Sequence, residues 1–237
     1  MSSVILSQPL DVNKFSIIYA GAQKNIGPAG LTIVIINKEF MHMGNENLPN
    51  ILKYSEHSKS NSMLNTPPTF SWYLAGKVFK WMIKLGGLDY FEEQNKLKAS
   101  LLYDFIDNSD FYSNPIHTSC RSIMNVPFIL ENSMLEKKFI SEASDNGFLN
   151  LKGHRLVGGM RASIYNAMPL EGVKELIKFM DYFKSENGWF MAKDDLKNLR
   201  GKIDKIDQQL YTLIQKRASH AVAIGKIKSK VTPSASF

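Results

Sequence analysis

The sequence predicts an α/β protein that is followed by one long α-helix. Two short β-branched runs bounded by glycines are typical of buried strands, and strand-like and helix-like runs alternate after them. Beyond Trp189, apolar residues recur at the spacing of three and four that indicates a helix with one apolar stripe. At about 150 residues a domain, the 237 residues allow one large or two small domains.

The first expected elements are two buried strands joined by a tight turn. Residues 15–21 and 31–36 are short and β-branched, as strands covered on both faces are. Residues 22–30 between them are rich in Gly and Pro, which indicates a turn. A helix is expected from the prolines at 67–68 to the glycines at 86–87.

The other elements of the α/β part follow the order helix, strand, helix, strand, strand, helix. Within each segment, the apolar positions keep the spacing of a helix or a strand. The expected ranges are a helix over 88–107, a strand around 124–130, a helix around 133–145, strands near 148–152 and 162–167, and a helix over 170–185.

Residues 189–237 differ from the rest of the chain in pattern and in charge. They hold 10 Lys and Arg against 4 Asp and Glu, whereas residues 1–188 hold 19 against 18. Most of the formal charge of +7 therefore belongs to this tail, and so sharp a step indicates a junction near Gly188. Because a lone helix cannot bury its apolar stripe, we expect the tail to need a partner.

Nothing in the sequence indicates a membrane or secreted protein. No apolar run approaches the roughly 20 residues of a membrane helix, and the first residues do not read as a signal peptide. The single cysteine, Cys120, excludes an internal disulfide and a cysteine-built zinc site. We therefore expect a cytoplasmic protein without a metal site.

Lys24 is the first candidate for chemistry. It follows an expected strand and lies in the Gly- and Pro-rich turn, where the backbone can approach a ligand closely. Burial in such a turn would lower its pKa, and a neutral amine suits Schiff-base chemistry with an aldehyde cofactor. The alternative is a surface lysine in an ordinary turn.

Three separated motifs resemble one known family. They are Tyr19-Ala-Gly-Ala-Gln-Lys24-Asn-Ile-Gly-Pro-Ala-Gly30, then Ser62-Met-Leu-Asn65-Thr66-Pro-Pro-Thr-Phe70, and last Leu151-Lys-Gly-His154-Arg155 with Gly158-Gly-Met-Arg161-Ala-Ser-Ile-Tyr. In this order they resemble the phosphoserine aminotransferases, which are pyridoxal-phosphate enzymes. The resemblance covers residues 1 to about 188. It implies the C-terminal part of a PLP-dependent transferase fold like that of aspartate aminotransferase.

The resemblance assigns roles at the cofactor to four residues. Lys24 would hold pyridoxal 5'-phosphate as a Schiff base and later move the proton between the substrate α-carbon and the cofactor. Gln23 would contact the cofactor phosphate, and Asn65 and Thr66 would reach the same phosphate from the neighbouring subunit of a homodimer. The last two also precede an expected helix N-terminus, where free N–H groups favour an anion. Simple capping of that helix is a second interpretation, which is compatible with the first.

His154, Arg155 and Arg161 are the expected substrate-binding residues. The substrates of the resembled family are phosphoserine with 2-oxoglutarate, or glutamate with 3-phosphooxypyruvate. The resemblance assigns His154 and Arg155 to the substrate phosphate or side carboxylate, and Arg161 to the α-carboxylate. Arginine binds such groups through a planar fork of donors. Taken alone, the pair at 154 and 155 would be an ordinary solvated loop.

A second resemblance lies in the C-terminal helix. The run from Leu199 to Leu210, followed by Arg217 and Lys228, resembles the first helix of the all-helical chorismate mutases. There Arg200, Arg217 and Lys228 would bind the carboxylates and the ether oxygen of chorismate. Arg217 and Lys228 are about three turns apart and so share a face, whereas Arg200 points elsewhere, consistent with a role in a partner's site. The alternative is a basic amphipathic helix that only packs or touches nucleic acid.

Both resemblances are expected to be partial. The first begins after the family's aspartate that pairs with the cofactor's pyridine nitrogen, and the second lacks the later mutase helices. The expected domains are the end of the cofactor-binding large domain over 1–92, the small domain over 93–188, and the mutase-like helix over 189–237. We therefore expect an internal piece of a fused protein, or of two neighbouring reading frames run together, with little or no turnover by itself.

The expected function is phosphoserine transamination in the synthesis of serine and of vitamin B6. It would act on small-molecule substrates, without nucleic-acid or membrane partners. Chorismate mutase activity in phenylalanine synthesis is the alternative among enzymes. A non-catalytic remnant or dimerisation module is the alternative outside them.

Overall fold

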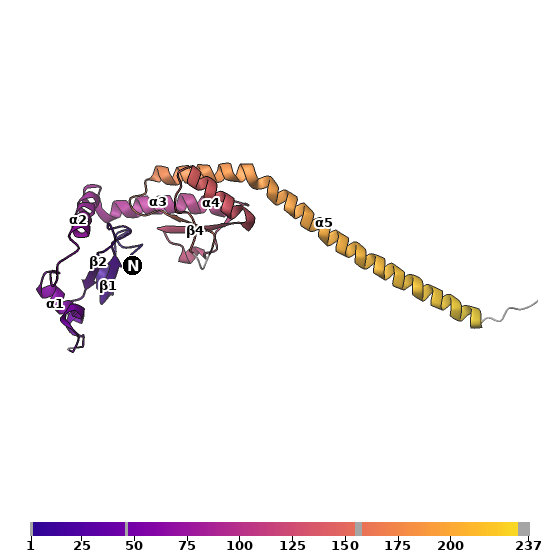
Figure 1. Cartoon of the computed structure of the whole chain (residues 1–237), viewed down its shortest axis with the longest axis horizontal. Helices are drawn as coiled ribbons and strands as arrows, with labels where there is room; N and C mark the ends of the chain where they lie inside the picture. Colours follow the sequence, from indigo (N-terminus) through magenta and orange to yellow (C-terminus); the bar gives the residue numbers. More distant parts are fainter. Residues whose placement is uncertain (1, 46, 155–157, 232–237) are drawn as a thin grey trace, which may run out of the picture. The chain divides into compact units, whose positions relative to one another are not determined.

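The computed structural model describes residues 2–45, 47–154 and 158–231 (Figure 1). In the long last helix, side chains are described as far as residue 188 and again over 199–228. The chain divides into two compact units, Met1–Phe183 and Lys184–Phe237.

The first unit begins with an antiparallel hairpin. Strands β1 (Ile17–Gly21) and β2 (Thr32–Ile36) pair from Ile17 opposite Ile36 to Gly21 opposite Thr32. Both expected strands are confirmed, but the expected burial of the second is wrong. The inner side chains of β1 pack into a small core with Ile5, Ile26 and Ala75, whereas the outer half of β2 stays exposed, Ile35 by 40%.

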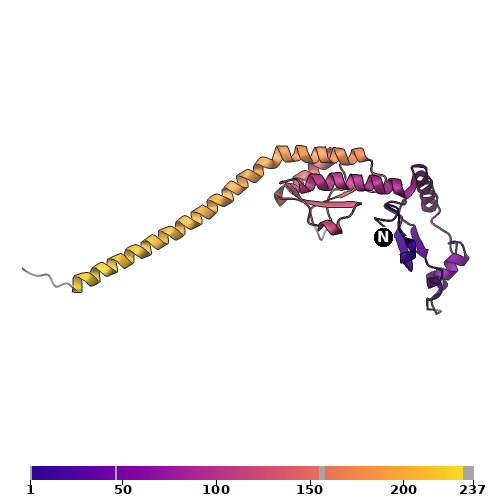
Figure 2. The ribbon, with the colours of Figure 1, turned by 180° about the vertical axis from the view of Figure 1, so that it is seen from behind.

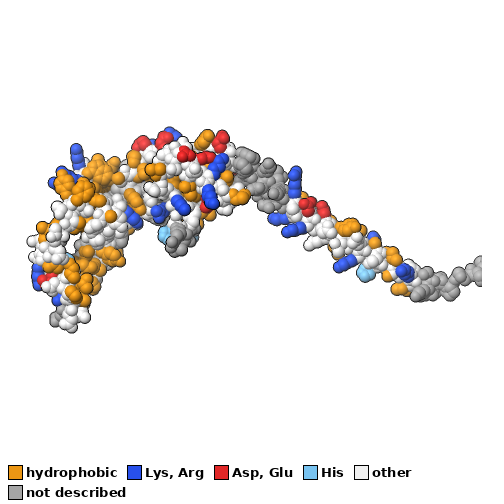
Figure 3. Space-filling model, in the orientation of Figure 1, with side chains coloured by type: hydrophobic (Ala, Val, Ile, Leu, Met, Phe, Trp, Pro, Cys, Tyr) orange, Lys and Arg blue, Asp and Glu red, His pale blue; other side chains and the backbone are white. Residues whose placement is uncertain are grey.

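Helices then follow the hairpin. They are the short α1 (Tyr54–Lys59), which the sequence pattern did not predict, α2 (Thr69–Lys84) and α3 (Gly87–Asp107). Gly86 has φ 115°, a left-handed conformation that ends α2 and lets α3 begin, so the expected glycine stop is confirmed. The capping alternative for Asn65 and Thr66 is wrong, because the cap residue of α2 is Pro68 and no side chain bonds there. Figure 3 shows hydrophobic side chains gathered over α2, where Phe70 and Ile83 are more than 70% exposed.

The second half of the first unit is a three-stranded antiparallel sheet covered by helices. The strand order is β3-β4-β5. The elements are β3 (Tyr112–Ser113), β4 (Asn125–Leu130), the single turn η5 (Ser133–Leu135), α4 (Glu136–Asp145), β5 (Met160–Ser163) and the start of α5 (Leu170–Val231). The expected helices at 88–107 and 133–145 and the strand at 124–130 are confirmed.

Two expected strands need correction. Residues 148–152 form only an isolated bridge, between Lys152 and Met160, because Gly147 and Asn150 adopt left-handed φ values of 85° and 62° and turn the chain. The strand expected near 162–167 is β5 and begins two residues earlier. It ends at Ser163, since the chain then enters a turn closed by the N–H of Met168 on the carbonyl of Tyr165.

The core of this half lies on one face of the sheet. Alternate residues of β4 and β5, such as Val126, Phe128 and Ala162, are buried. In Figures 1 and 2, α3, α4 and the first turns of α5 lie on the same side of β4. Phe139 of α4 is fully buried at the centre of an aromatic cluster. Its ring lies 5.0 to 6.1 Å from the rings of Tyr112, Phe128, Phe179 and Phe183.

The second unit is the helical tail. The two helices expected over 170–185 and from residue 196 onward are a single helix, α5, because the glycines at 188 and 201 do not interrupt it. A glycine inside a helix costs only about 1 kcal/mol, which neighbouring residues can offset. The apolar stripe is present and exposed, with Leu199, Ile206 and Leu210 each more than half exposed. Within the described residues, no helix combines the length and the apolar character needed to cross a membrane.

Candidate functional site

The face of the sheet opposite the helices carries the polar residues of the candidate site. Because strand residues alternate, Arg161 and Ser163 of β5 lie on the same side as Asn125 of β4, and all three are half-buried. Tyr165 follows directly, and its hydroxyl donates to Asn125 Oδ1 at 3.2 Å. The hydroxyl of Ser163 donates to the same oxygen, also at 3.2 Å. We call Asn125, Arg161, Ser163 and Tyr165 the open face.

The turn after β1 presents Lys24. The carbonyl of Ala22 accepts from the N–H groups of Lys24 at 2.7 Å and of Gly27 at 2.8 Å, so the chain folds tightly around it. Lys24 is nevertheless exposed, and the sequence-based expectation that the turn buries it is wrong. The turn thus fixes the backbone of Lys24 and leaves its side chain exposed.

Lys24 and the open face meet at Tyr165. The Nζ atom of Lys24 lies 5.9 Å from the centre of the Tyr165 ring, within the range of a cation–π contact. From Ser163 to Arg161 is two residues along one strand, or about 7 Å. Lys24 thus contacts Tyr165 of the open face, to which the expected carboxylate-binding arginine also belongs.

Gln23 lies beside Lys24 and is exposed. Its side-chain amide folds back against Gly21, where a Cβ atom would collide with Oε1 of Gln23. Glycine at position 21 thus leaves the room that the amide occupies. The amide of Gln23 can donate a hydrogen bond to an anionic group of a ligand that is bound at the amine of Lys24.

Arg161 carries a polar atom without a partner. Its backbone N–H donates to the carbonyl of Leu151 at 2.7 Å, which fixes the strand. Its Nε atom is buried and has no hydrogen-bond partner among the described residues. An unpaired buried donor costs free energy, and a carboxylate on the open face would satisfy it. This observation fits the expected role of Arg161, which stays a prediction.

His154 lies in a loop that is tied to the strand of Arg161. The N–H of Gly153 donates to Gly159 and the N–H of Gly158 donates to His154, both at 2.8 Å. Gly158 and Gly159 have positive φ, which lets the loop close tightly. His154 is exposed, and Arg155 lies outside the described residues. Their assignment to the substrate stays a prediction.

Asn65 and Thr66 lie elsewhere in the first unit. Both are exposed and line a hollow of about 490 Å³ beside β2 and the start of α2, together with Trp72. The lining of this hollow includes neither Lys24 nor Gln23. A role for Asn65 and Thr66 at the cofactor of a neighbouring subunit stays a prediction.

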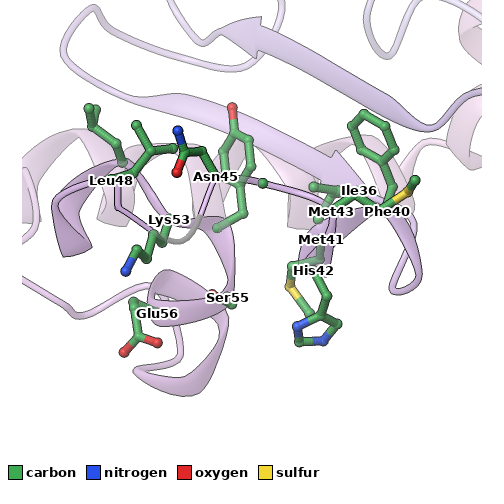
Figure 4. Close-up of a pocket in the computed structure, with 13 residues that line it drawn as sticks. Ile36, Phe40, Met41, His42, Met43, Asn45, Leu48, Lys53, Ser55 and Glu56 are labelled. Carbon is green, nitrogen blue, oxygen red and sulfur yellow. The ribbon is translucent and has the colours of Figure 1, made fainter.

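A second hollow, of about 550 Å³, lies between β2 and α1 (Figure 4). Its lining is mostly apolar, with His42, Lys53, Tyr54 and Glu56 as its charged or titratable side chains. The carboxylate of Glu56 is already paired with Lys59 at 2.7 Å, and this hydrogen bond holds the pKa of Glu56 below its usual value. Over the described ranges, no three His, Cys, Asp or Glu side chains are grouped to hold a metal ion.

Lys98 and a set of asparagines behind the site are functional candidates that the sequence reasoning missed. Lys98 is 2% exposed, and burial lowers its pKa to about 8. Asn95 and Lys98 stand between the buried Phe91 and Leu102 at helical spacing, so two polar residues interrupt the apolar face of α3. That interruption is visible in the sequence and could have identified them.

The expected residues of the tail lie on exposed helix. Arg200, Arg217 and Lys228 are all exposed along α5. Their roles toward chorismate stay predictions.

Comparison with known families gives two matches. The family described as Aminotransferase class-V matches residues 1–176, and the family described as Chorismate mutase type II matches residues 199–234. Among curated proteins, the phosphoserine aminotransferase of Acinetobacter baumannii is 60% identical over 187 residues, and that of Hahella chejuensis is 57% identical over 187 residues. Each alignment covers 79% of this chain and 52% of the relative, so the chain spans about half the length of the curated relatives it matches.

Solved structures confirm the expected fold. The phosphoserine aminotransferase from Bacillus circulans subsp. alkalophilus matches with a TM-score of 0.77 and 47% identity, over 79% of this chain and 52% of that one. A PLP-bound phosphoserine aminotransferase from Trichomonas vaginalis matches with a TM-score of 0.72 and 40% identity, over 76% of this chain and 52% of that one. The α/β part thus has the aminotransferase fold, and the long helix follows it.

Proposed function

The chain belongs to the class-V aminotransferase family, and from that premise we propose that it carries the cofactor-anchoring lysine and the substrate-carboxylate site of a phosphoserine transaminase. The reaction is O-phospho-L-serine with 2-oxoglutarate to 3-phosphooxypyruvate and L-glutamate. The observation that supports it best is the meeting of Lys24, through Tyr165, with the strand that carries the unpartnered Nε of Arg161.

The residues present fit pyridoxal 5'-phosphate as the cofactor. When bound, this group supplies an electron sink that stabilises negative charge on the substrate α-carbon. Lys24 has an exposed amine that can hold an aldehyde carbon, and the amide of Gln23 beside it can donate to a phosphate oxygen. In its neutral form, Nζ of Lys24 is also the base that takes the proton from the α-carbon and returns it.

The substrate groups are assigned to the open face and the loop beside it. Arg161 would grip the α-carboxylate through its fork of donors, which orients the α-carbon toward Lys24. His154 and Arg155 would take the substrate phosphate or the side carboxylate of glutamate. Asn65 and Thr66 would serve the cofactor of a second copy, so a homodimer is part of the proposal. So is a cytoplasmic setting, which the single Cys120 supports.

Covalent capture tests the role of Lys24. The protein is incubated with pyridoxal phosphate, reduced with borohydride and mapped by peptide mass spectrometry. We expect the adduct on Lys24 well above the level on Lys80, an exposed lysine of α2 that serves as internal reference. Lys24→Gln is the control and should leave only the background on other lysines. Equal labelling of Lys24 and Lys80 would contradict the proposal.

The tail supports a second candidate function, chorismate mutase. The match to the type II family over residues 199–234 favours it, as do Arg217 and Lys228, which share a helix face. Conversion of chorismate, followed by its loss of absorbance, should fall in Arg217→Gln and persist in Lys216→Gln, an exposed neighbour on another face. If the protein does not convert chorismate, this second function is contradicted, and the helix serves only to pack against a partner. The division into domains over 1–92, 93–188 and 189–237 stays part of the proposal.

A further inference from the structure

A chain of buried amides lies directly behind the exposed Lys24. Asn25, the next residue, is only 5% exposed. Its Nδ2 donates to the carbonyls of Ser3 and Ile5, both at 3.0 Å, and its Oδ1 accepts from the backbone N–H of Asn166 at 3.1 Å. The amide thus uses its donors and its acceptor at once, which neither a carboxylate nor an apolar side chain could do.

Asn166 continues the chain toward α3. Its Nδ2 donates to the carbonyl of Leu6 at 2.8 Å, and its Oδ1 accepts from Nδ2 of Asn95 at 2.9 Å. Nδ2 of Asn95 also donates to the carbonyl of Ser7 at 3.0 Å. The amides of Asn25, Asn166 and Asn95, which we call the amide chain, therefore join the N-terminal segment, the Lys24 turn, α3 and the loop after β5.

Lys98 holds the same loop from the helix side. It lies one turn after Asn95 on α3, and its Nζ donates to the carbonyls of Ile164 at 3.2 Å, Tyr165 at 2.9 Å and Met168 at 3.0 Å. All three protons of the ammonium group are thereby used, and each acceptor is a backbone atom. An apolar residue of the same length would leave three carbonyls without this donor.

Tyr165 is consequently fixed at both ends. Lys98 holds its backbone carbonyl, and Asn125 accepts from its hydroxyl at 3.2 Å. On the other side, the Asn25–Asn166 bond sets the distance from this loop to the Lys24 turn. The two segments that meet at the Lys24–Tyr165 contact are thus connected behind it by buried hydrogen bonds.

We propose that the amide chain and Lys98 position Lys24 against Tyr165 and the open face, so that Asn25 and Lys98 are positioning residues for the reaction. The inference rests on the proposed function, because its purpose is to aim the amine of Lys24. Displacement of a reacting group by about 1 Å can reduce a rate by about a hundred-fold. A small shift of the turn that carries Lys24 would therefore slow the reaction.

Two measurements on Asn25→Asp and Lys98→Met test the proposal. The first is hydrogen exchange of the backbone, expected to speed up in both the 22–27 turn and the 164–168 loop in either variant. The second is the ratio of pyridoxal phosphate capture at Lys24 to capture at Lys80, expected to fall about ten-fold or more. Ile106→Ala on α3 is the matched control, since this buried residue lies outside the amide chain. It should lower the melting temperature without changing either readout.

The possible results distinguish a failure of this inference from a failure of the proposed function on which it rests. Faster exchange confined to the segment that carries the substitution would overturn the proposal, and so would an unchanged capture ratio in both variants. Lys98→Arg, which restores a charged donor, should recover part of the ratio. If the unaltered protein shows no preference for Lys24, the proposed function fails, and the coupled exchange alone then decides whether the amide chain connects the two segments.

Discussion

The side-chain oxygen of Asn25 accepts the backbone N–H of Asn166 at 3.1 Å, although 141 positions separate the two residues in the chain. This bond joins the turn that presents Lys24 to the loop that presents Tyr165. The direction of the Lys24 amine is therefore not a local property of its Gly- and Pro-rich turn. It depends on a buried contact with the second half of the unit.

Replacing Asn25 with leucine should destabilise the protein strongly. The substitution leaves the carbonyls of Ser3 and Ile5 and the N–H of Asn166 buried without their partner. Each such loss costs about 1–3 kcal/mol, so we expect the free energy of unfolding in urea to fall by at least about 2 kcal/mol. Asn146→Leu is the control, because its exposed amide bonds only within its own helix end, and a change of similar size there would contradict the prediction.

Lys98 should make stability depend on pH in the alkaline range. Burial lowers its pKa in the folded protein to about 8, against an ordinary value of 10.5. Between these values the unfolded chain keeps the proton and the folded chain has released it, so stability rises with pH, by up to about 3 kcal/mol. Below pH 8 both states are protonated and this contribution is constant.

The matched variant for this titration is Lys98→Met, which removes the titrating group and keeps most of the length of the side chain. The difference in unfolding free energy between the two proteins should grow from pH 8 to pH 10.5 in favour of the unaltered protein. Tyr112, whose pKa burial raises, works in the opposite direction at high pH but is common to both proteins. A difference that stays flat over this range would contradict the prediction.

Arg161→Lys should weaken the binding of glutamate in the presence of pyridoxal phosphate. Lysine keeps the positive charge but loses the planar fork and the buried Nε donor, and we expect a loss of about ten-fold in affinity. Titration calorimetry gives the dissociation constants. Arg121→Lys is the control, since Arg121 pairs with Asp107 away from the open face, with Nη2 to Oδ1 at 2.8 Å. Equal losses in both variants would argue against a specific role for Arg161.

Phe139→Ala should be among the most damaging core substitutions. The ring is fully buried and contacts Phe183 at 5.0 Å and Phe179 at 5.3 Å, between the sheet and the start of α5. Removal of a buried phenylalanine ring costs about 3–5 kcal/mol. Phe139→Leu should cost clearly less in the same urea titration, because it fills most of the cavity. Similar losses for both would show that the cluster tolerates a void.

Much of the secondary structure can be predicted from the sequence, because the residues that mark each element lie within it or next to it. The glycine pair at 86–87 ends one helix and starts another, and β-branched runs mark β1 and β2. The exposure of Lys24 and the burial of Asn25 do not follow from local sequence. Both depend on which distant segment packs behind the turn, and no neighbouring residue encodes that partner.

The strands near the site also depend on contacts that local sequence does not predict. The expected strand at 148–152 has suitable residues, but left-handed φ values at Gly147 and Asn150 turn the chain, and only Lys152 bridges to Met160 of β5. A motif alone predicts a substrate role for Arg161, whereas the burial of its Nε atom depends on where β5 lies in the sheet. The change in charge and apolar spacing near Gly188 predicts two separate helices, whereas α5 runs through that glycine without a break, because a long helix tolerates a single glycine.

Gly159 and Gly158 offer a matched pair that separates backbone strain from collision beside Arg161. Both have positive φ, 60° and 78°, so alanine is strained at either position, at a cost of about 1–2 kcal/mol. A Cβ on Gly158 meets nothing within 4 Å, whereas one on Gly159 would lie 2.8 Å from the carbonyl oxygen of Phe128 in β4. Gly159→Ala must therefore also push β5 away from β4, where Arg161 pairs with Pro127. We expect Gly159→Ala to lower the melting temperature more than Gly158→Ala and to weaken glutamate binding as well, and equal effects would show that only strain matters in this loop.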